Sequence, residues 1–201
     1  FLQLGPQLET TFSGDLMDRQ ILDGYIIYMI AFQKYLGRIP VDRVEMTPKG
    51  LCLMETVYWD FRKEPHLLIS GGTGGGKSVL LFILILALAK FSNLYICDPK
   101  RADLANLERY DVFQGQVYFE VPDIVNCVIN AWKMMNKRYD YMRQSPQNKM
   151  GLDYSDYGMK PTFIIIDEVG AMTSELEGMR GSRLAAEYFN ALQQIAQKGR
   201  Q

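Results

Sequence analysis

Apolar and polar residues alternate in blocks along the second half of the chain, and the blocks have the lengths of buried strands and crossover helices. The predicted strands are 66–70, 94–97, 116–119 and 162–166, and the predicted helices are 77–91, 122–142 and 185–198. A strand, loop, helix, strand order is typical of a parallel sheet with crossover helices. The pattern therefore predicts an α/β fold with a mostly parallel sheet flanked by helices.

The first 60 residues have a different pattern. A capping residue at Asp15 followed by an apolar stretch predicts a helix over 15–36. Residues 41–46 and 51–59, separated by a Pro-Lys-Gly turn at 48–50, predict two antiparallel strands at the edge of the main sheet. These elements form a small N-terminal helical and β appendage to the α/β core.

Two apolar stretches are better explained as packed helices than as membrane spans. Residues 79–89 are wholly apolar but too short to cross a bilayer. Residues 21–36 are longer but include Asp23 and Lys34, which leaves an interfacial helix as the alternative. Neither a secretory signal nor a membrane anchor is visible in this sequence.

Composition narrows the class of protein. Charged residues at 22% and hydrophobic residues at 48% are ordinary for a soluble globular domain and argue against a disordered or fibrous chain. The net charge of −1 excludes a uniformly basic surface, although a local basic stripe could still bind nucleic acid. Cys52, Cys97 and Cys127 form no CxxC pair, which argues against disulfides and a zinc site. Cys97, at the end of a predicted strand, and Cys127, in a predicted helix, are expected to be small buried hydrophobic residues rather than reactive thiols.

A glycine-rich octapeptide, 71–78, lies between the first predicted strand and the long apolar helix. It fits the phosphate-binding loop pattern, in which two framing glycines enclose four residues before Lys-Ser. A glycine-rich hairpin or linker is the alternative, but a strand before the loop and a helix after it are the context that the motif requires. The predicted nucleotide-binding residues are Gly71, Gly72, Thr73, Gly74, Gly75, Gly76, Lys77, Ser78 and Val79.

Each of these residue types has a chemical reason to be there. Glycines allow successive backbone N–H groups to face phosphate oxygens, and the N-terminus of the following helix adds positive potential. We expect the Lys77 ammonium to act catalytically on the β- and γ-phosphates of ATP and the Ser78 hydroxyl to bind Mg²⁺.

Two acids follow the predicted strand 162–166. Because ligands of open parallel sheets bind beyond the carboxyl ends of the strands, Asp167 and Glu168 are expected near the phosphate loop. Asp167 is the candidate for holding Mg²⁺, and Glu168 is the candidate for polarising the water that attacks the γ-phosphate. A strand that merely ends in an acidic turn is the alternative.

Two further charged segments receive no assigned chemistry. The turn 98–101, Asp-Pro-Lys-Arg, projects charges at the same sheet edge, where it could sense nucleotide, contact a neighbouring subunit or be an ordinary turn. The helix 122–142 mixes basic and aromatic residues, which suits nucleic acid but more often marks a solvated face beside a core face.

The motifs occur in an order that resembles FtsK/SpoIIIE-type DNA translocases, over about residues 50–201. They are Pro65-His66-Leu67-Leu68-Ile69, the phosphate loop, Asp98-Pro99-Lys100, Arg138-Tyr139, Asp167-Glu168 and Ala196-Gln197-Lys198-Gly199-Arg200. Gly75 stands where serine is frequent, and Val169-Gly170-Ala171 replaces the more usual Phe-Ala-Asp. The N-terminal part looks more like the transfer ATPases of conjugative elements than the chromosome-partitioning members.

The resemblance implies a RecA-like motor that hydrolyses ATP with Mg²⁺, assembles as a homo-hexamer and threads double-stranded DNA through its pore. It implies a motor domain over 46–201, truncated at its C-terminal end and therefore weakly active or inactive alone, after an N-terminal appendage or part of a preceding domain over 1–45. It also implies a cytoplasmic location, with a membrane tether outside this fragment left open. A related type VII-like protein-secretion ATPase and a nucleotide-binding assembly module without turnover remain the alternatives.

Overall fold

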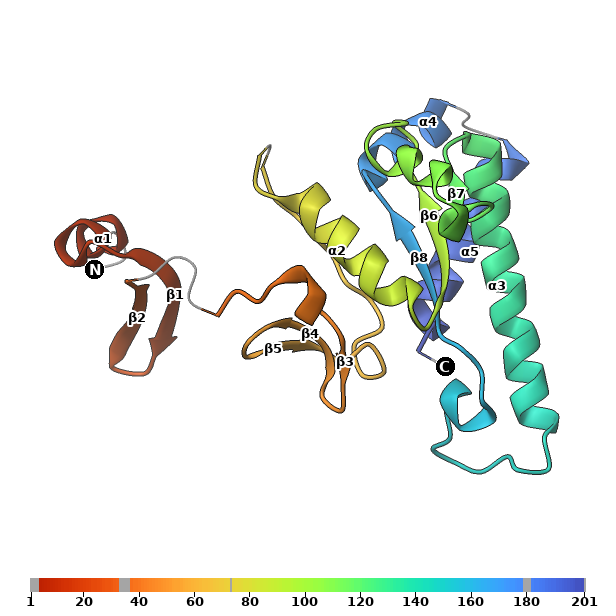
Figure 1. The fold of residues 1–201 in the computed structure, drawn as a ribbon, viewed down its shortest axis with the longest axis horizontal. Helices are drawn as coiled ribbons and strands as arrows, with labels where there is room; N and C mark the ends of the chain where they lie inside the picture. Colours follow the sequence, from red (N-terminus) through yellow and green to blue (C-terminus); the bar gives the residue numbers. More distant parts are fainter. Residues whose placement is uncertain (1–3, 33–36, 73, 179–181, 201) are drawn as a thin grey trace.

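The chain is described here by a computed structural model, which covers residues 4–32, 37–72, 74–178 and 182–200 (Figure 1). The helices are α1 (Gly5–Phe12), α2 (Lys77–Ala89), α3 (Val121–Gln144), α4 (Val169–Gly178) and α5 (Arg183–Lys198). The strands are β1 (Asp15–Leu22), β2 (Tyr25–Ala31), β3 (Met46–Thr47), β4 (Gly50–Met54), β5 (Val57–Trp59), β6 (Asn93–Cys97), β7 (Val117–Tyr118) and β8 (Thr162–Ile166). Short 3₁₀ helices are η1 (Val41–Arg43), η2 (Leu104–Arg109), η3 (Asp111–Phe113) and η4 (Tyr154–Tyr157).

The main sheet is parallel, with strand order β7-β6-β8. Ile96 in the central strand β6 lies opposite Val117 of β7 and Ile165 of β8. Parallel strands require long crossover connections, and α3 supplies the one that crosses β6 from β7 to β8. The predicted α/β fold with a helix-flanked parallel sheet is confirmed.

The two faces of this sheet pack against different helices. Alternate side chains of a strand point to opposite faces, so Leu94 and Ile96 join the apolar cluster around α2. Tyr95 and Cys97 join a second cluster built from α3, α4 and α5. Figure 1 shows α2 on one side of the sheet and α3 with α5 on the other. The sheet is therefore the middle layer of three.

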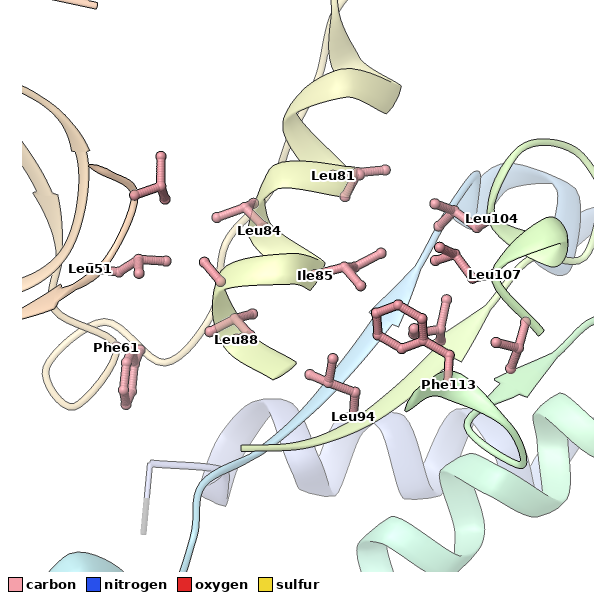
Figure 2. Packing of buried hydrophobic residues seen from close by; sticks show 14 of the residues in the cluster. Leu51, Phe61, Leu81, Leu84, Ile85, Leu88, Leu94, Leu104, Leu107 and Phe113 are labelled. Carbon is pink, nitrogen blue, oxygen red and sulfur yellow. The ribbon is translucent and has the colours of Figure 1, made fainter. Parts of the chain in front are cut away.

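Helix α2 is packed on two sides, which explains its uninterrupted apolar sequence. In Figure 2, Leu84 and Leu88 point toward the antiparallel strands, whereas Leu81 and Ile85 point the other way, toward η2 and η3. Within the described ranges, none of the helices combines the length and apolar character that a membrane span requires.

The antiparallel strands β3, β4 and β5 form a separate small sheet, not an edge of the main one as predicted. The predicted strand 41–46 is instead η1 followed by β3, and 51–59 is divided into β4 and β5 by a turn at Glu55-Thr56. The predicted Pro-Lys-Gly turn joins β3 to β4. Gly50 is required there because its φ is +115° and a Cβ would lie 2.5 Å from the Trp59 carbonyl oxygen.

The predicted helix over 15–36 is wrong. Residues 15–31 form an antiparallel hairpin in which Leu22 lies opposite Tyr25 across a two-residue turn, while 33–36 lie outside the described residues. The turn is Asp23-Gly24, with Gly24 at φ +89°, and it is a strong hairpin signal when flanked by β-branched and aromatic residues. The apolar content of this segment favoured one helix, but the Asp-Gly turn divides the segment into two strands.

The segment 66–70 does not form the predicted strand. Residues of this segment and of β8 line the same cavity of about 610 Å³. Strand β8 pairs with β6 and not with this segment. Pairing supplies the hydrogen bonds that define a strand, and none of the described strands pairs with this segment. The Leu68 side chain is accordingly 88% exposed.

Candidate nucleotide-binding site

The phosphate loop leads directly into the first turn of α2. Gly76 caps the helix in the left-handed region at φ +84°, and Gly74 has φ +77°. The Gly75 N–H donates to the Gly72 carbonyl at 3.0 Å and closes a turn inside the loop. Chain neighbours aside, no heavy atom of the described residues lies within 4 Å of a Cβ built at Gly74 or Gly76, so positive φ, not crowding, calls for glycine at both positions.

The start of α2 is suited to an anion. The first N–H groups of a helix have no intrahelical acceptor, and α2 has no side-chain cap. Lys77, Ser78 and Val79 occupy these first positions, so their N–H groups and the helix dipole favour a phosphate. The five glycines from Gly71 to Gly76 and these three residues are described, whereas Thr73 lies outside the described residues.

Strand pairing brings the ends of β6 and β8 to one edge of the sheet. Cys97 lies opposite Ile166, and the Asp167 N–H donates to the Cys97 carbonyl at 2.9 Å. Asp98 therefore follows β6 at the level where Asp167 and Glu168 follow β8. The expectation that the acids emerge at this edge depends on parallel pairing, which the structure has.

Glu168 contacts two lysines from different parts of the chain. Its carboxylate lies 3.5 Å from the Lys77 Nζ and 3.1 Å from the Lys100 Nζ. The hydrogen bond and charge of Lys100, with a smaller contribution from Lys77, lower the pKa of Glu168. The structure thus brings together Lys77 and Glu168, which were predicted as one site, and adds Lys100, for which the sequence supplied no assigned role.

Asp167 has a different environment from its neighbour. Partial burial raises the pKa of Asp167, with further raising by the charges of Asp98 and Glu168, while Lys77 acts in the opposite direction. Asp98 is buried, and its Oδ2 accepts from the Ala105 N–H at 3.0 Å. Within the described residues, Asp98 Oδ1 has no hydrogen-bond partner. Negative charge therefore accumulates beside the phosphate loop.

The residues present fit a magnesium ion that a nucleotide helps to bind. Mg²⁺ prefers hard oxygen ligands and is usually held by one or two carboxylates, substrate phosphates and water. Asp167 and Ser78 provide a carboxylate and a hydroxyl, and a cation would offset the local negative charge. In the described part of the chain, no cluster of three or more His, Cys, Asp or Glu residues forms a cage for a metal on its own.

The basic and aromatic residues of α3 are partly committed to structure. The Arg138 guanidinium donates to the Lys160 carbonyl at 2.9 Å, and the Tyr139 hydroxyl donates to the Lys198 carbonyl at 2.6 Å. These bonds attach α3 to the loop before β8 and to the end of α5. They favour the structural interpretation of Arg138 and Tyr139 over direct contact with nucleic acid.

The two cysteines that were predicted to be buried are buried in the structure. Cys97 and Cys127 are buried and Cys52 is half-buried, all as free thiols. A hydrogen bond between the thiols of Cys97 and Cys127, together with burial, raises the pKa of Cys97. Both residues lie inside the cluster around α3 and α5, which suits packing rather than thiolate chemistry.

The fold and site define a P-loop nucleotide-binding α/β domain. The family model of the FtsK/SpoIIIE family matches residues 39–172, which is more than half of the sequence. The chain belongs to the FtsK/SpoIIIE family. The resemblance predicted from the order of the motifs is confirmed.

Individual relatives agree with this assignment. The chain is 36% identical, over its full length, to the Ftsk domain-containing protein YdcQ of Bacillus subtilis, of which it covers 41%. It is 33% identical over 124 residues to the DNA translocase FtsK of Pseudomonas putida, a match that covers 57% of this chain and 15% of that protein. The chain thus spans less than half the length of these relatives.

A solved structure shares the fold. The monomer form of the pCW3 conjugation coupling protein TcpA with ATPgS matches with a TM-score of 0.66 and 23% sequence identity. The match covers 99% of this chain and 60% of that chain. It includes the N-terminal hairpin as well as the α/β core.

Proposed function

We propose that this chain is the ATP-binding and ATP-hydrolysing part of an FtsK/SpoIIIE-type DNA translocase. The observation that carries the proposal is the meeting of Lys77 from the phosphate loop with Glu168 from the end of β8, at 3.5 Å. These residues are 91 positions apart in sequence. A phosphate-binding lysine beside an ionised carboxylate is the arrangement that phosphoryl transfer to water needs.

The residues divide the chemistry between them. The glycine loop and the first N–H groups of α2 cradle the phosphates, and Lys77 neutralises charge on the β- and γ-phosphoryl groups. Ser78 and Asp167 would hold Mg²⁺, which supplies further charge stabilisation when bound. Glu168, kept ionised by its lysine neighbours, accepts a hydrogen bond from the attacking water and orients it.

Double-stranded DNA is the substrate proposed for the whole protein, with a homo-hexamer as the working assembly. Support comes from the family and from relatives named as DNA translocases. The shared fold with a conjugation coupling protein supports a role in conjugative transfer. The ATPgS in that structure supports ATP as the nucleotide. A cytoplasmic location follows from the same proposal.

The test is steady-state ATP hydrolysis by the full-length protein, with and without double-stranded DNA. We expect DNA to stimulate hydrolysis, and Lys77→Ala to abolish both ATP binding and turnover. Lys149→Ala, in the exposed loop after α3, is the matched control and should behave like the wild type. Stimulation by a secreted peptide instead of DNA would favour the protein-secretion alternative, and ATP binding without any turnover would favour the assembly module.

A further inference from the structure

We infer that Lys100 is a positioning residue that holds the Glu168 carboxylate in place when nucleotide occupies the phosphate loop. The inference rests on the proposed function, because it concerns the step in which Glu168 orients water. It assigns a role to the turn 98–101. The Lys100 Nζ lies 3.1 Å from one Glu168 oxygen, and Lys77 approaches the other oxygen at 3.5 Å.

The turn that carries Lys100 is fixed at its first residue, Asp98, to β7 and to η2, and it is closed by an internal hydrogen bond. The Asp98 N–H donates to the Tyr118 carbonyl at 2.9 Å, and the Arg101 N–H donates back to the Asp98 carbonyl at 3.1 Å. The buried Asp98 side chain accepts from Ala105. Lys100 therefore extends from a defined position and is not part of a free loop.

Glu168 is fixed in the same way at the end of β8. It has φ +56°, an uncommon conformation for a residue other than glycine, and its carbonyl accepts from the Ala171 N–H at 2.9 Å in the first turn of α4. Non-glycine residues in such conformations cluster at functional sites. Both ends of the Lys100–Glu168 pair thus start from an anchored backbone, which reduces the entropy lost in forming it.

The two lysines differ in what nucleotide would do to them. Lys77 lies in the phosphate loop, so phosphates would draw its ammonium away from Glu168. Lys100 lies outside that loop and stays available to the carboxylate. Among the described residues, Lys100 is the cation nearest to the Glu168 carboxylate and Lys77 is slightly farther away, so Lys100 remains its main counter-ion when nucleotide is bound.

Arg101 provides a matched comparison one residue further on. Its guanidinium forms an ion pair with Glu120 and lies 5.6 Å from the centre of the Phe119 ring. It therefore points toward β7 and the start of α3. Removing this charge changes the same turn without touching Glu168.

The experiment compares Lys100→Met, Lys100→Arg and Arg101→Met in the full-length protein. We expect Lys100→Met to lower kcat by about tenfold or more while the affinity for a non-hydrolysable ATP analogue changes less than about threefold, because positioning acts on the chemical step. Lys100→Arg should recover most of kcat, and Arg101→Met should match the wild type.

Several outcomes would overturn the inference. Lys100→Met with unchanged kcat would show that the pair has no role in turnover. A rise in kcat would show that Lys100 restrains Glu168 instead of positioning it, and an equal loss of kcat in Arg101→Met would indicate a general surface-charge effect. Failure of the wild type to bind or hydrolyse ATP would instead overturn the proposed function.

Discussion

The middle of the β6–β8 pair and its carboxyl end are only a few residues apart, but they differ in burial and in charge. In the middle, Ile96 is fully buried between the helix layers. At the end, the side chains of Lys100 and Glu168 are 53% and 40% exposed. The middle holds the fold together by excluding water, whereas the end concentrates charge where a phosphate can approach. Substitutions in the two regions should therefore change different measurements.

The largest expected effect comes from the charged end. Glu168→Gln removes the carboxylate that orients water, and we expect turnover by the full-length protein to fall about 10²- to 10⁴-fold. Thermal unfolding should change little, because an exposed residue contributes little to the core. Retained turnover would show that another group orients the water, and the charged end of the strand pair would then not be the part that serves catalysis.

The apolar middle supplies the reciprocal test. Ile96→Ala removes a fully buried side chain and should lower the free energy of unfolding by about 2–5 kcal/mol, measured by denaturant titration. ATP affinity of the folded fraction should stay close to that of the wild type. A large loss of affinity at unchanged stability would mean that the strand interior takes part in binding, contrary to the separation described above.

A smaller effect on stability, without an effect on turnover, is expected outside the β6–β8 pair, in the antiparallel strands before the phosphate loop. Gly50→Ala places a methyl group 2.5 Å from the Trp59 carbonyl oxygen at φ +115°, and should lower stability by about 1–3 kcal/mol. Gly24 also has positive φ, but apart from its chain neighbours no described atom lies within 4 Å of the added Cβ, so Gly24→Ala tests backbone strain alone. Equal losses in the two variants would show that the contact with Trp59 has no cost of its own.

The α/β core was predictable because its signals are local. The apolar runs of β6, β8 and α2 match their predicted positions to within two residues, and α3 begins one residue before its predicted start. The same holds for the phosphate loop, whose glycines, lysine and serine are contiguous. Asp167 and Glu168 could be placed at the correct edge because a parallel sheet aligns the ends of its strands.

The prediction failed for other elements, either because a turn signal was outweighed by apolar content or because strand pairing cannot be read from the sequence. The Asp23-Gly24 turn was present in the sequence, but the apolar content around it favoured a helix, and the hairpin was missed. The helices α1 and α4 were missed as well. Residues 66–70 have a strand-like composition, but a strand needs a neighbour for its hydrogen bonds.

The sequence by itself determined which groups can bind phosphate and metal, since glycine, lysine, serine and carboxylate chemistry belongs to the residues. Only the tertiary structure decided how these groups act on one another. Lys100 and Glu168 are 68 positions apart, and nothing local to either residue pairs them. Their contact exists because β6 and β8 lie side by side in parallel register, which places the two strand ends, and the charges beyond them, at one edge of the sheet.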